Sequence, residues 1–334
     1  MADAFPIIDV SPLLRPDASD AAVAAVAEQI NAACETIGFF AVKGHGVAPG
    51  TIRALYDAAY AFFDLPVAEK QRVARPRPEQ NRGYIGFGDE TLARLAGQET
   101  PPDLKELFAI GPFDLPDEPY FTGPAAYPSL APNLWPERPA ELATALKAYW
   151  HGVERLAWTL CGAYARALGL PAGFFSDKVD RHISQLRVMH YPARDTPPLP
   201  GQLRAGAHTD LSMMTLLYSD NDVGGLQVQT RAGDWVDAPL LTDAFVVNIG
   251  DLMMRWTNDR WVSTPHRVVN PEAEAATGSR RLSVGMFFIP NYDAEVTCLE
   301  TCTGPDRAPR YSPTTVTAYR TERFARTAGT AQTR

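Results

Sequence analysis

Two histidines and one aspartate have the types and spacing that suit metal chemistry. His208 and Asp210 are two positions apart, and His266 follows after 55 intervening residues (211–265). Residues two apart on a β-strand face the same side, so a strand over 207–218 would point His208 and Asp210 inward together. If His266 begins a neighbouring strand, two imidazoles and one carboxylate meet on one face of a metal ion. Three open positions then remain, which suits non-haem Fe(II) that activates O2.

Arg281 and Ser283 form a second pair with this spacing. Their guanidinium and hydroxyl are expected to share an interior face. A buried arginine needs an anionic partner, because an unpaired charge is costly in the protein interior. The neighbouring strand-like runs offer no suitable acid, so the partner is expected to be a ligand carboxylate held by the guanidinium fork. A structural ion pair with a loop acid such as Asp251 is the alternative. Arg280 competes for the role but has no hydroxyl two residues later.

The elements that must position these residues are short strands between residues 183 and 290. Frequent turn residues separate them, which favours a sandwich or jelly roll over a parallel α/β sheet. The expected strands are 185–191, 213–218, 226–229, 245–249, 266–269 and 282–289. Upstream, strands are expected at 5–10 and 39–42 and helices at 20–37 and 51–63. A proline-rich connection over 112–139 precedes a long helix whose apolar residues, from Leu142 to Leu160, recur every three or four positions.

Composition narrows the class of protein. The chain has 334 residues, of which 46% are hydrophobic and 21% charged, with a formal net charge of -8. These values are typical of a globular protein and disfavour binding to nucleic acid or to an anionic membrane. No apolar run approaches the length of a membrane span, and no signal peptide is evident. Four scattered cysteines form no disulfide framework, so we expect a reducing cytoplasm and, by default, a monomer.

The remaining histidines and cysteines carry weaker signals. His45 and His151 are expected to be structural, and His190 should point away from its neighbour Tyr191 on a strand. Cys298 and Cys302 are four positions apart, but no second pair of cysteines accompanies them, so a zinc site is not expected.

The order of these residues resembles a known family. His208-x-Asp210, His266 and Arg281-x-Ser283 are similar to the motifs of iron(II)/2-oxoglutarate-dependent dioxygenases, in the branch that resembles isopenicillin N synthase. The likeness runs from residue 5 to about residue 290. Further matching segments are Phe5–Asp9, Gly38–Phe40, Gly44–Gly46, Arg82–Tyr84, Asp103–Glu106, Gly224–Val228, Asn248–Asp251 and Ser263–Arg267. One departure is the stretch 272–278, which is longer than in plant members and is interpreted as an enlarged hairpin loop.

The resemblance implies a mainly β fold with flanking α-helices, built on a double-stranded β-helix (jelly-roll) core. Residues 1–135 would form an N-terminal region packed on that core, 136–180 support helices, 181–295 the core itself, and 296–334 a segment covering the mouth of the barrel. His208, Asp210 and His266 would bind Fe(II). Arg281, Ser283 and the hydroxyl of Tyr191 would hold the distal carboxylate of 2-oxoglutarate.

The activity implied is oxidation of a small molecule by O2, with release of succinate and CO2. Hydroxylation, desaturation and ring closure all remain open, and a role in natural-product biosynthesis is the analogy we favour. Two alternatives stand beside it: an iron oxidase that does not use 2-oxoglutarate, as in isopenicillin N synthase, and a non-catalytic jelly-roll protein that binds a metal or ligand. The arginine–serine motif does not separate the first alternative from the main hypothesis.

Candidate residues for the cavity are mostly apolar, because a strong oxidant requires a dry pocket. They are Met213, Leu216, Val247 and Met286 around the metal, and Tyr84, Phe87, Tyr319 and Phe324 near the mouth. Taken singly, each of the first four is interpreted first as a core residue, and the four near the mouth serve equally well as packing aromatics.

Overall fold

The computed structural model describes residues 5–194, 196–219, 224–271 and 279–329, and within them the chain forms two main β-sheets. The larger sheet has the strand order β1 (Ile7–Asp9), β2 (Phe39–Lys43), β10 (Phe245–Ile249), β7 (Met214–Ser219), β12 (Arg281–Phe288), β5 (Gln185–Tyr191), β4 (Glu106–Ile110) and β3 (Gly83–Ile85). The smaller sheet has the order β6 (Ala205–His208), β11 (His266–Val268), β8 (Leu226–Gln229) and β9 (Trp235–Asp237).

The two faces of the larger sheet have different partners. One face packs on helices α2 (Asp20–Thr36), α3 (Pro49–Phe63) and α6 (Glu141–Ala167), and this side holds most of the apolar core. The other face meets the smaller sheet in a second cluster, here called the inner cluster: Ile85, Leu107, Ala109, Met189, Tyr191, Ala205, Leu226 and Val268. The sheets therefore face each other as in a jelly roll, although the larger sheet does not close into a barrel.

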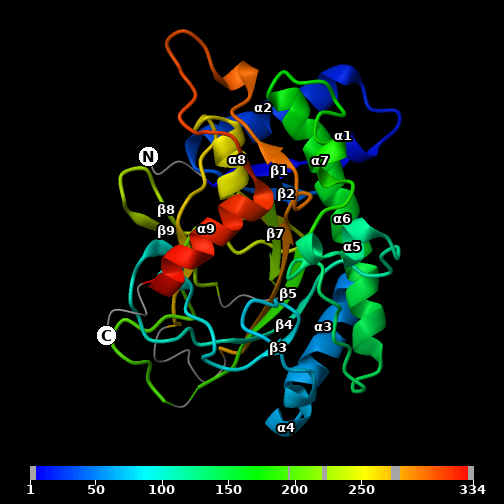
Figure 1. Cartoon of the computed structure of the whole chain (residues 1–334), viewed down its shortest axis with the longest axis vertical. Helices are drawn as coiled ribbons and strands as arrows, with labels where there is room; N and C mark the ends of the chain where they lie inside the picture. The colour runs from blue at the N-terminus through cyan, green and yellow to red at the C-terminus, as the bar shows by residue number, and fades with distance from the viewer. Residues whose placement is uncertain (1–4, 195, 220–223, 272–278, 330–334) are drawn as a thin grey trace.

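The helices form where the sequence places apolar residues on one side. The hydroxyl of Ser19 caps α2 by accepting a hydrogen bond from the N–H of Ala22 at 3.2 Å. Helix α6 buries a stripe from Leu142 to Ala165 and packs against both α2 and α3. Figure 1 shows α6 running along one side of the molecule. Shorter helices are α1 (Ser11–Leu14), α4 (Val67–Lys70), α5 (Pro119–Thr122), α7 (Ser176–Val179) and α8 (Asp251–Trp256), and α9 (Val316–Gly329) ends the described chain.

Several predicted elements are confirmed with small shifts at their ends. Strands β5, β8 and β10 have the predicted bounds, and β12 begins one residue early, at Arg281. The N-terminal segment contributes β1 to β4 to the larger sheet itself, and neither β3 nor β4 was predicted. The small strands β13 (Glu295–Val296) and β14 (Thr314–Thr315) form a separate ribbon. The predicted hairpin loop at 272–278 lies outside the described residues.

The prediction of one strand over 207–218 is wrong. Strand β6 ends at His208 and β7 begins at Met214, so Asp210 lies in the loop between them. This loop bonds to the corner between β10 and α8, and its last residue, Met213, also donates to the carbonyl of Phe288 on β12 at 3.0 Å. The N–H of Asp251 donates to the carbonyl of Asp210 at 2.8 Å, and the N–H of Gly250 donates to that of Met213 at 3.1 Å.

Among the described helices, none combines the length and apolarity that crossing a membrane requires.

The contact between this loop and Gly250 gives a test of how the loop is held. A Cβ at Gly250 would lie 2.1 Å from the backbone oxygen of Ser212. We expect Gly250→Ala to lower the free energy of unfolding by about 1–3 kcal/mol, because backbone must move. The matched control is Gly162→Ala on α6, where an added Cβ would meet no described atom within 4 Å beyond the nearby backbone of its own helix. Thermal and urea unfolding should show Gly162→Ala as neutral or stabilising by up to ~1 kcal/mol. Equal effects of the two substitutions would contradict a tightly held loop.

Candidate metal centre and anion site

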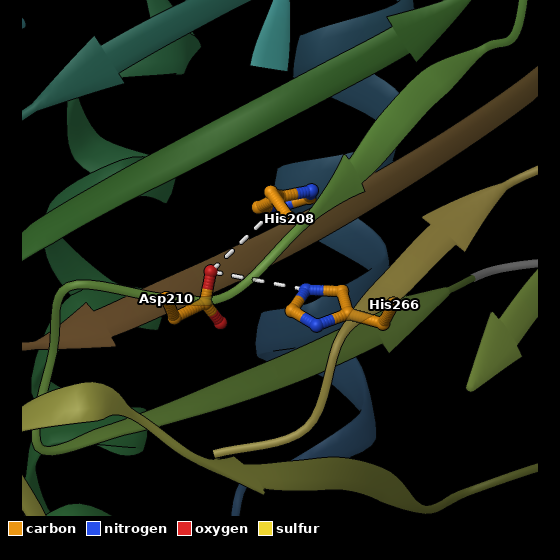
Figure 2. A group of neighbouring side chains, drawn as sticks. All are labelled: His208, Asp210 and His266. Atoms are coloured by element: carbon orange, nitrogen blue, oxygen red, sulfur yellow. Dashed lines mark ion pairs between the residues drawn. The ribbon is translucent and has the colours of Figure 1, made fainter. Parts of the chain in front are cut away.

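His208, Asp210 and His266 converge although they come from two strands and a loop. His266 lies directly opposite His208 in the register of β11 and β6. Oδ1 of Asp210 is 3.7 Å from Nε2 of His208 and 3.8 Å from Nε2 of His266. Ligand atoms of all three residues lie within 4.8 Å of one another, and this is the one such group of metal-binding type among the described residues. Figure 2 shows the two rings and the carboxylate directed at a common point.

Hydrogen bonds fix the tautomer of both rings. Nδ1 of His208 lies 2.8 Å from the carbonyl oxygen of Gly206, and Nδ1 of His266 lies 3.1 Å from that of Thr264. A carbonyl oxygen only accepts, so each Nδ1 carries the proton and each Nε2 keeps its lone pair for a metal. Burial, together with His266, lowers the pKa of His208 to about 3, so this imidazole is neutral near pH 7. The donor set thus fits a divalent iron.

The carboxylate of Asp210 is held in the same way. Its Oδ2 accepts the hydroxyl of Thr215 and the amide of Asn248, both at 2.7 Å, which leaves Oδ1 directed at the histidines. Burial acts to raise the pKa of Asp210, but the two histidines and these hydrogen bonds outweigh it and keep the pKa below its usual value. One oxygen is therefore anchored and the other is an ionised ligand atom.

Arg281 and Ser283 face the inner cluster, as their spacing predicts. Arg281 lies opposite Tyr191 in the register of β12 and β5, and its guanidinium carbon is 5.1 Å from the centroid of the Tyr191 ring. Ser283 lies opposite Met189 on β5 and Ser219 on β7. Arg281 is 3% exposed, yet its Nε and Nη1 and the Oγ of Ser283 have no hydrogen-bond partner within the described chain. These groups form a site with the chemistry to hold an anion.

Contacts decide against the two alternatives to a ligand-binding Arg281, which are an ion pair with Asp251 and the use of Arg280 in its place. Asp251 accepts the hydroxyls of Ser263 at 2.7 Å and Tyr319 at 2.8 Å, so it is not the partner of Arg281. Arg280 points to the other face of the sheet, where it pairs with Asp64 and donates to Nε2 of His190 at 2.8 Å.

The structure also places the residues that the sequence assigned to structural roles. His190 lies 2.8 Å from Glu106, on the face opposite Tyr191, as predicted. His45 is buried beside Asp243, and His151 contacts Glu154 on the surface. Cys298 and Cys302 are buried free thiols, and neither belongs to a metal-binding group among the described residues.

Four of the candidate cavity residues are core residues, which is the favoured interpretation of each, and they lie on the side of the sheet away from Arg281. Met213, Leu216, Val247 and Met286 belong to the core cluster on the helical face. The reason is strand alternation: Met286 is five positions from Arg281, and Leu216 and Val247 follow Met286 in register, so all face away from Arg281. Tyr84 is likewise a core residue, and its hydroxyl donates to Glu106.

A hollow of about 720 Å³ opens beside His208. Its walls include the 3₁₀ segment Leu92–Ala96, Thr209 and Trp235, and Arg323 of α9. Helix α9 is bonded to this region, because Arg320 donates to the carbonyl of Leu211 at 2.8 Å. Tyr319 is buried against Asp251, whereas Phe87 and Phe324 remain exposed.

Sequence reasoning missed the residues that support the ligands. Asn248 was noted only as part of a family-like segment, and Thr215 was not singled out. Lys105 is 1% exposed by side chain and pairs with Asp103 at 2.6 Å and Glu90 at 3.4 Å. The charge of Lys105 acts to lower the pKa of His208, and Tyr191 acts to raise the pKa of Lys105, so Lys105 lies on the side of the sheet that faces the inner cluster. Alternation could have revealed Lys105, since it precedes Leu107 of the inner cluster by two positions.

The support of Asp210 predicts graded losses of metal affinity. Asp210→Asn removes the charged ligand and should abolish measurable binding of Mn²⁺, an air-stable probe for the site. Thr215→Val removes one hydrogen bond from Oδ2 and should weaken Mn²⁺ binding about 10-fold. Calorimetry or the electron paramagnetic resonance of free Mn²⁺ measures both.

Thr159→Val is the control for that series, because among the described residues this hydroxyl on α6 bonds only to the carbonyl of Arg155. It should bind Mn²⁺ as the wild type does. Full binding by Asp210→Asn would mean that the three residues are not the metal ligands.

Known proteins match the chain over most of its length. Residues 5–138 match the model of the N-terminal region of non-haem dioxygenases in morphine synthesis, and residues 182–290 match the 2OG-Fe(II) oxygenase superfamily. A 2-oxoglutarate-Fe(II) type oxidoreductase of Emericella nidulans is 34% identical over 319 residues, 93% of this chain and 86% of that protein. Validamycin A dioxygenase of Streptomyces hygroscopicus subsp. limoneus is 33% identical over 300 residues, 89% of this chain and 80% of that protein.

Solved structures agree with the sequence matches. A full-length Neurospora crassa protein in complex with alpha-KG superposes with a TM-score of 0.83 at 32% identity, covering 96% of this chain and 95% of that one. These matches favour 2-oxoglutarate-dependent catalysis over both alternatives, the iron oxidase that does not use 2-oxoglutarate and the non-catalytic binding protein. The chain therefore belongs to the 2-oxoglutarate–Fe(II) oxygenase superfamily and is a jelly-roll dioxygenase that uses Fe(II), 2-oxoglutarate and O2 to oxidise a small molecule.

Proposed function

We propose that His208, Asp210 and His266 are the iron ligands and that Arg281, Ser283 and Tyr191 hold the distal carboxylate of 2-oxoglutarate. The observation that carries this assignment is the buried Arg281 guanidinium, which has no carboxylate within 4.0 Å among the described residues and no hydrogen bond at Nε or Nη1. A charge left in this state costs several kcal/mol unless an anion accompanies it. The co-substrate is such an anion.

The two proposed sites adjoin each other through the inner cluster. Tyr191 packs there with Ala205 of β6 and Val268 of β11, the strands that carry His208 and His266. A five-carbon keto acid has its chelating end and its distal carboxylate at opposite ends. The proposal places its chelating end at the metal and its distal carboxylate at Arg281.

The chain positions the ligand atoms, keeps the carboxylate of Asp210 ionised and excludes water from the site. When bound, Fe(II) and 2-oxoglutarate activate O2 to oxidise an unactivated C–H bond, with release of succinate and CO2. Anchored Oδ2 of Asp210 and the two fixed tautomers hold the ligand atoms ready before the metal arrives. Apolar side chains on the inner face, such as Met189 and Leu107, exclude water from the reacting groups.

The substrate is proposed to be a small natural product that enters through the hollow beside His208 and is hydroxylated. Support comes from the position of the hollow and from relatives named for action on small molecules, validamycin A and homoarginine. We further propose a monomer in the cytoplasm, since the four cysteines are free thiols. Product analysis distinguishes hydroxylation from desaturation and ring closure.

Release of succinate from 2-oxoglutarate tests the assignment of Arg281. With Fe(II) and O2 present, Arg281→Met should raise the KM for 2-oxoglutarate at least about 10-fold, because it removes a charge-assisted bidentate contact. Ser283→Ala should have a smaller effect, and both variants should bind Mn²⁺ normally.

Arg280→Met is the neighbouring control, since that guanidinium contacts His190 and Asp64 on the other face. It should leave the KM for 2-oxoglutarate unchanged. If Arg280→Met raised this KM while Arg281→Met did not, the carboxylate site would have to be placed on the other face of the sheet.

A further inference from the structure

A second buried arginine stands beside the proposed carboxylate site. Arg204, the residue before β6, is 4% exposed. Its Nη2 donates to the carbonyl of Ser279, two residues before Arg281. Its Nη1 is buried without a hydrogen-bond partner, and no carboxylate of the described chain lies within 4.0 Å of the guanidinium. This cation is therefore only partly satisfied by the protein.

Arg204 and Arg281 approach the same ring. The guanidinium carbon of Arg204 is 5.6 Å from the centroid of Tyr191, and that of Arg281 is 5.1 Å from it. Burial, and then the charge of Arg281, lowers the pKa of Arg204 to about 10, with Tyr191 acting in the opposite direction. Two buried like charges thus repel each other at a site where no described acid pairs with either of them.

Two other arginines, the buried Arg82 and the partly buried Arg187, are not left in that condition. Arg82 donates to the carbonyls of Asn81, Ala131 and Ser129. Arg187 pairs with Glu90 at 3.1 Å and with the side-chain oxygen of Asn81 at 2.7 Å. The partly buried Arg255 also has one buried nitrogen, Nε, without a hydrogen-bond partner. What distinguishes Arg204 and Arg281 is that two such arginines approach the same ring.

The nearby acids are already occupied. Asp103 accepts Lys105 at 2.6 Å and the N–H of Gly206 at 3.0 Å, and Glu90 is shared by Lys105 and Arg187. No described acid is thus available to neutralise Arg204. An added anion would neutralise it, and the anion that this site is proposed to bind is a carboxylate.

We infer that Arg204 is a second cationic ligand of the distal carboxylate of the co-substrate, acting together with Arg281. The inference rests on the proposed placement of 2-oxoglutarate at Arg281 and Ser283. One carboxylate between two guanidiniums neutralises their repulsion as well as forming charge-assisted hydrogen bonds. The site should therefore discriminate strongly against keto acids that lack the second carboxylate.

A purely structural role predicts something different. In that role Arg204 would hold the carbonyl of Ser279 and pack on Tyr191, and its loss would lower the melting temperature and weaken every keto acid alike. A carboxylate ligand instead affects only acids with a distal carboxylate. Replacing an unpaired buried cation by an apolar side chain of similar length should also leave the ligand-free protein at least as stable.

The experiment compares 2-oxoglutarate with pyruvate, which has the same keto-acid end but no distal carboxylate. Binding of each acid to Mn²⁺-loaded protein is measured by calorimetry without O2-dependent turnover. Arg204→Met should weaken 2-oxoglutarate roughly 10- to 100-fold and leave pyruvate unchanged. Arg204→Lys, which keeps the charge but not the planar fork, should show a smaller loss confined to 2-oxoglutarate. Arg280→Met, the control, should bind both acids like the wild type.

The outcomes distinguish this inference from the proposed placement of 2-oxoglutarate at Arg281, on which it rests. Normal 2-oxoglutarate affinity in Arg204→Met, with weak affinity in Arg281→Met, overturns the inference and leaves the proposed function intact. Normal affinity in both variants overturns both. Equal losses for the two acids, with a lowered melting temperature, assign Arg204 a structural role and also reject the inference. If Arg204→Met does not fold, the affinities for 2-oxoglutarate and pyruvate are compared in Arg204→Lys instead, and a loss confined to 2-oxoglutarate is still expected.

Discussion

The free-energy cost of a buried polar group without a partner is the constraint on which this structure depends. Nε2 of both triad histidines and Oδ1 of Asp210 are directed into the interior, and each is kept available because the opposite atom of the same side chain is already bonded. Nε and Nη1 of Arg281 and Oγ of Ser283 are buried without a hydrogen bond from the described chain. Such groups persist in a folded protein when ligands complete them. The interior is therefore built to receive a cation at one place and an anion at another.

Strand alternation places these groups on the face of the sheet toward the inner cluster, while most of the apolar core lies on the helical face. Along β12 the odd positions Arg281 and Ser283 face the inner cluster, while Leu282 and Val284 pack on the helices. The same rule sends Arg280, just before the strand, and His190 to the opposite face, where they bond to each other. One sheet thus separates a conventional ion-pair network from a site where Arg281 has no acidic partner among the described residues. A shift of the strand register by one residue would exchange the side chains on the two faces of the sheet.

Much of the fold and site could be predicted from local patterns. Strands β5, β8 and β10 and helix α6 are continuous apolar or periodic segments, and their sequence signal is strong. Strands β3 and β4 gave no clear signal, because they are short runs paired with distant partners. The loop that carries Asp210 was mistaken for strand, since nothing local shows that it bonds to the corner at Gly250 and Asp251. Met213, Leu216, Val247 and Met286 are core residues, as their favoured interpretation predicts, and alternation along β12 turns Met286 away from Arg281.

The sequence by itself determined the chemistry: the types and order of His208, Asp210, His266, Arg281 and Ser283 indicate iron and a carboxylate, because few side-chain sets serve those ligands. Only the tertiary structure decided how the ligands are supported and that a second arginine, Arg204, lies beside Arg281. Thr215 and Asn248 reach Asp210 from neighbouring strands, and Arg204 reaches Tyr191 from the smaller sheet. These contacts join residues far apart along the chain, and pairing of strands in space, which no short pattern encodes, brings them together.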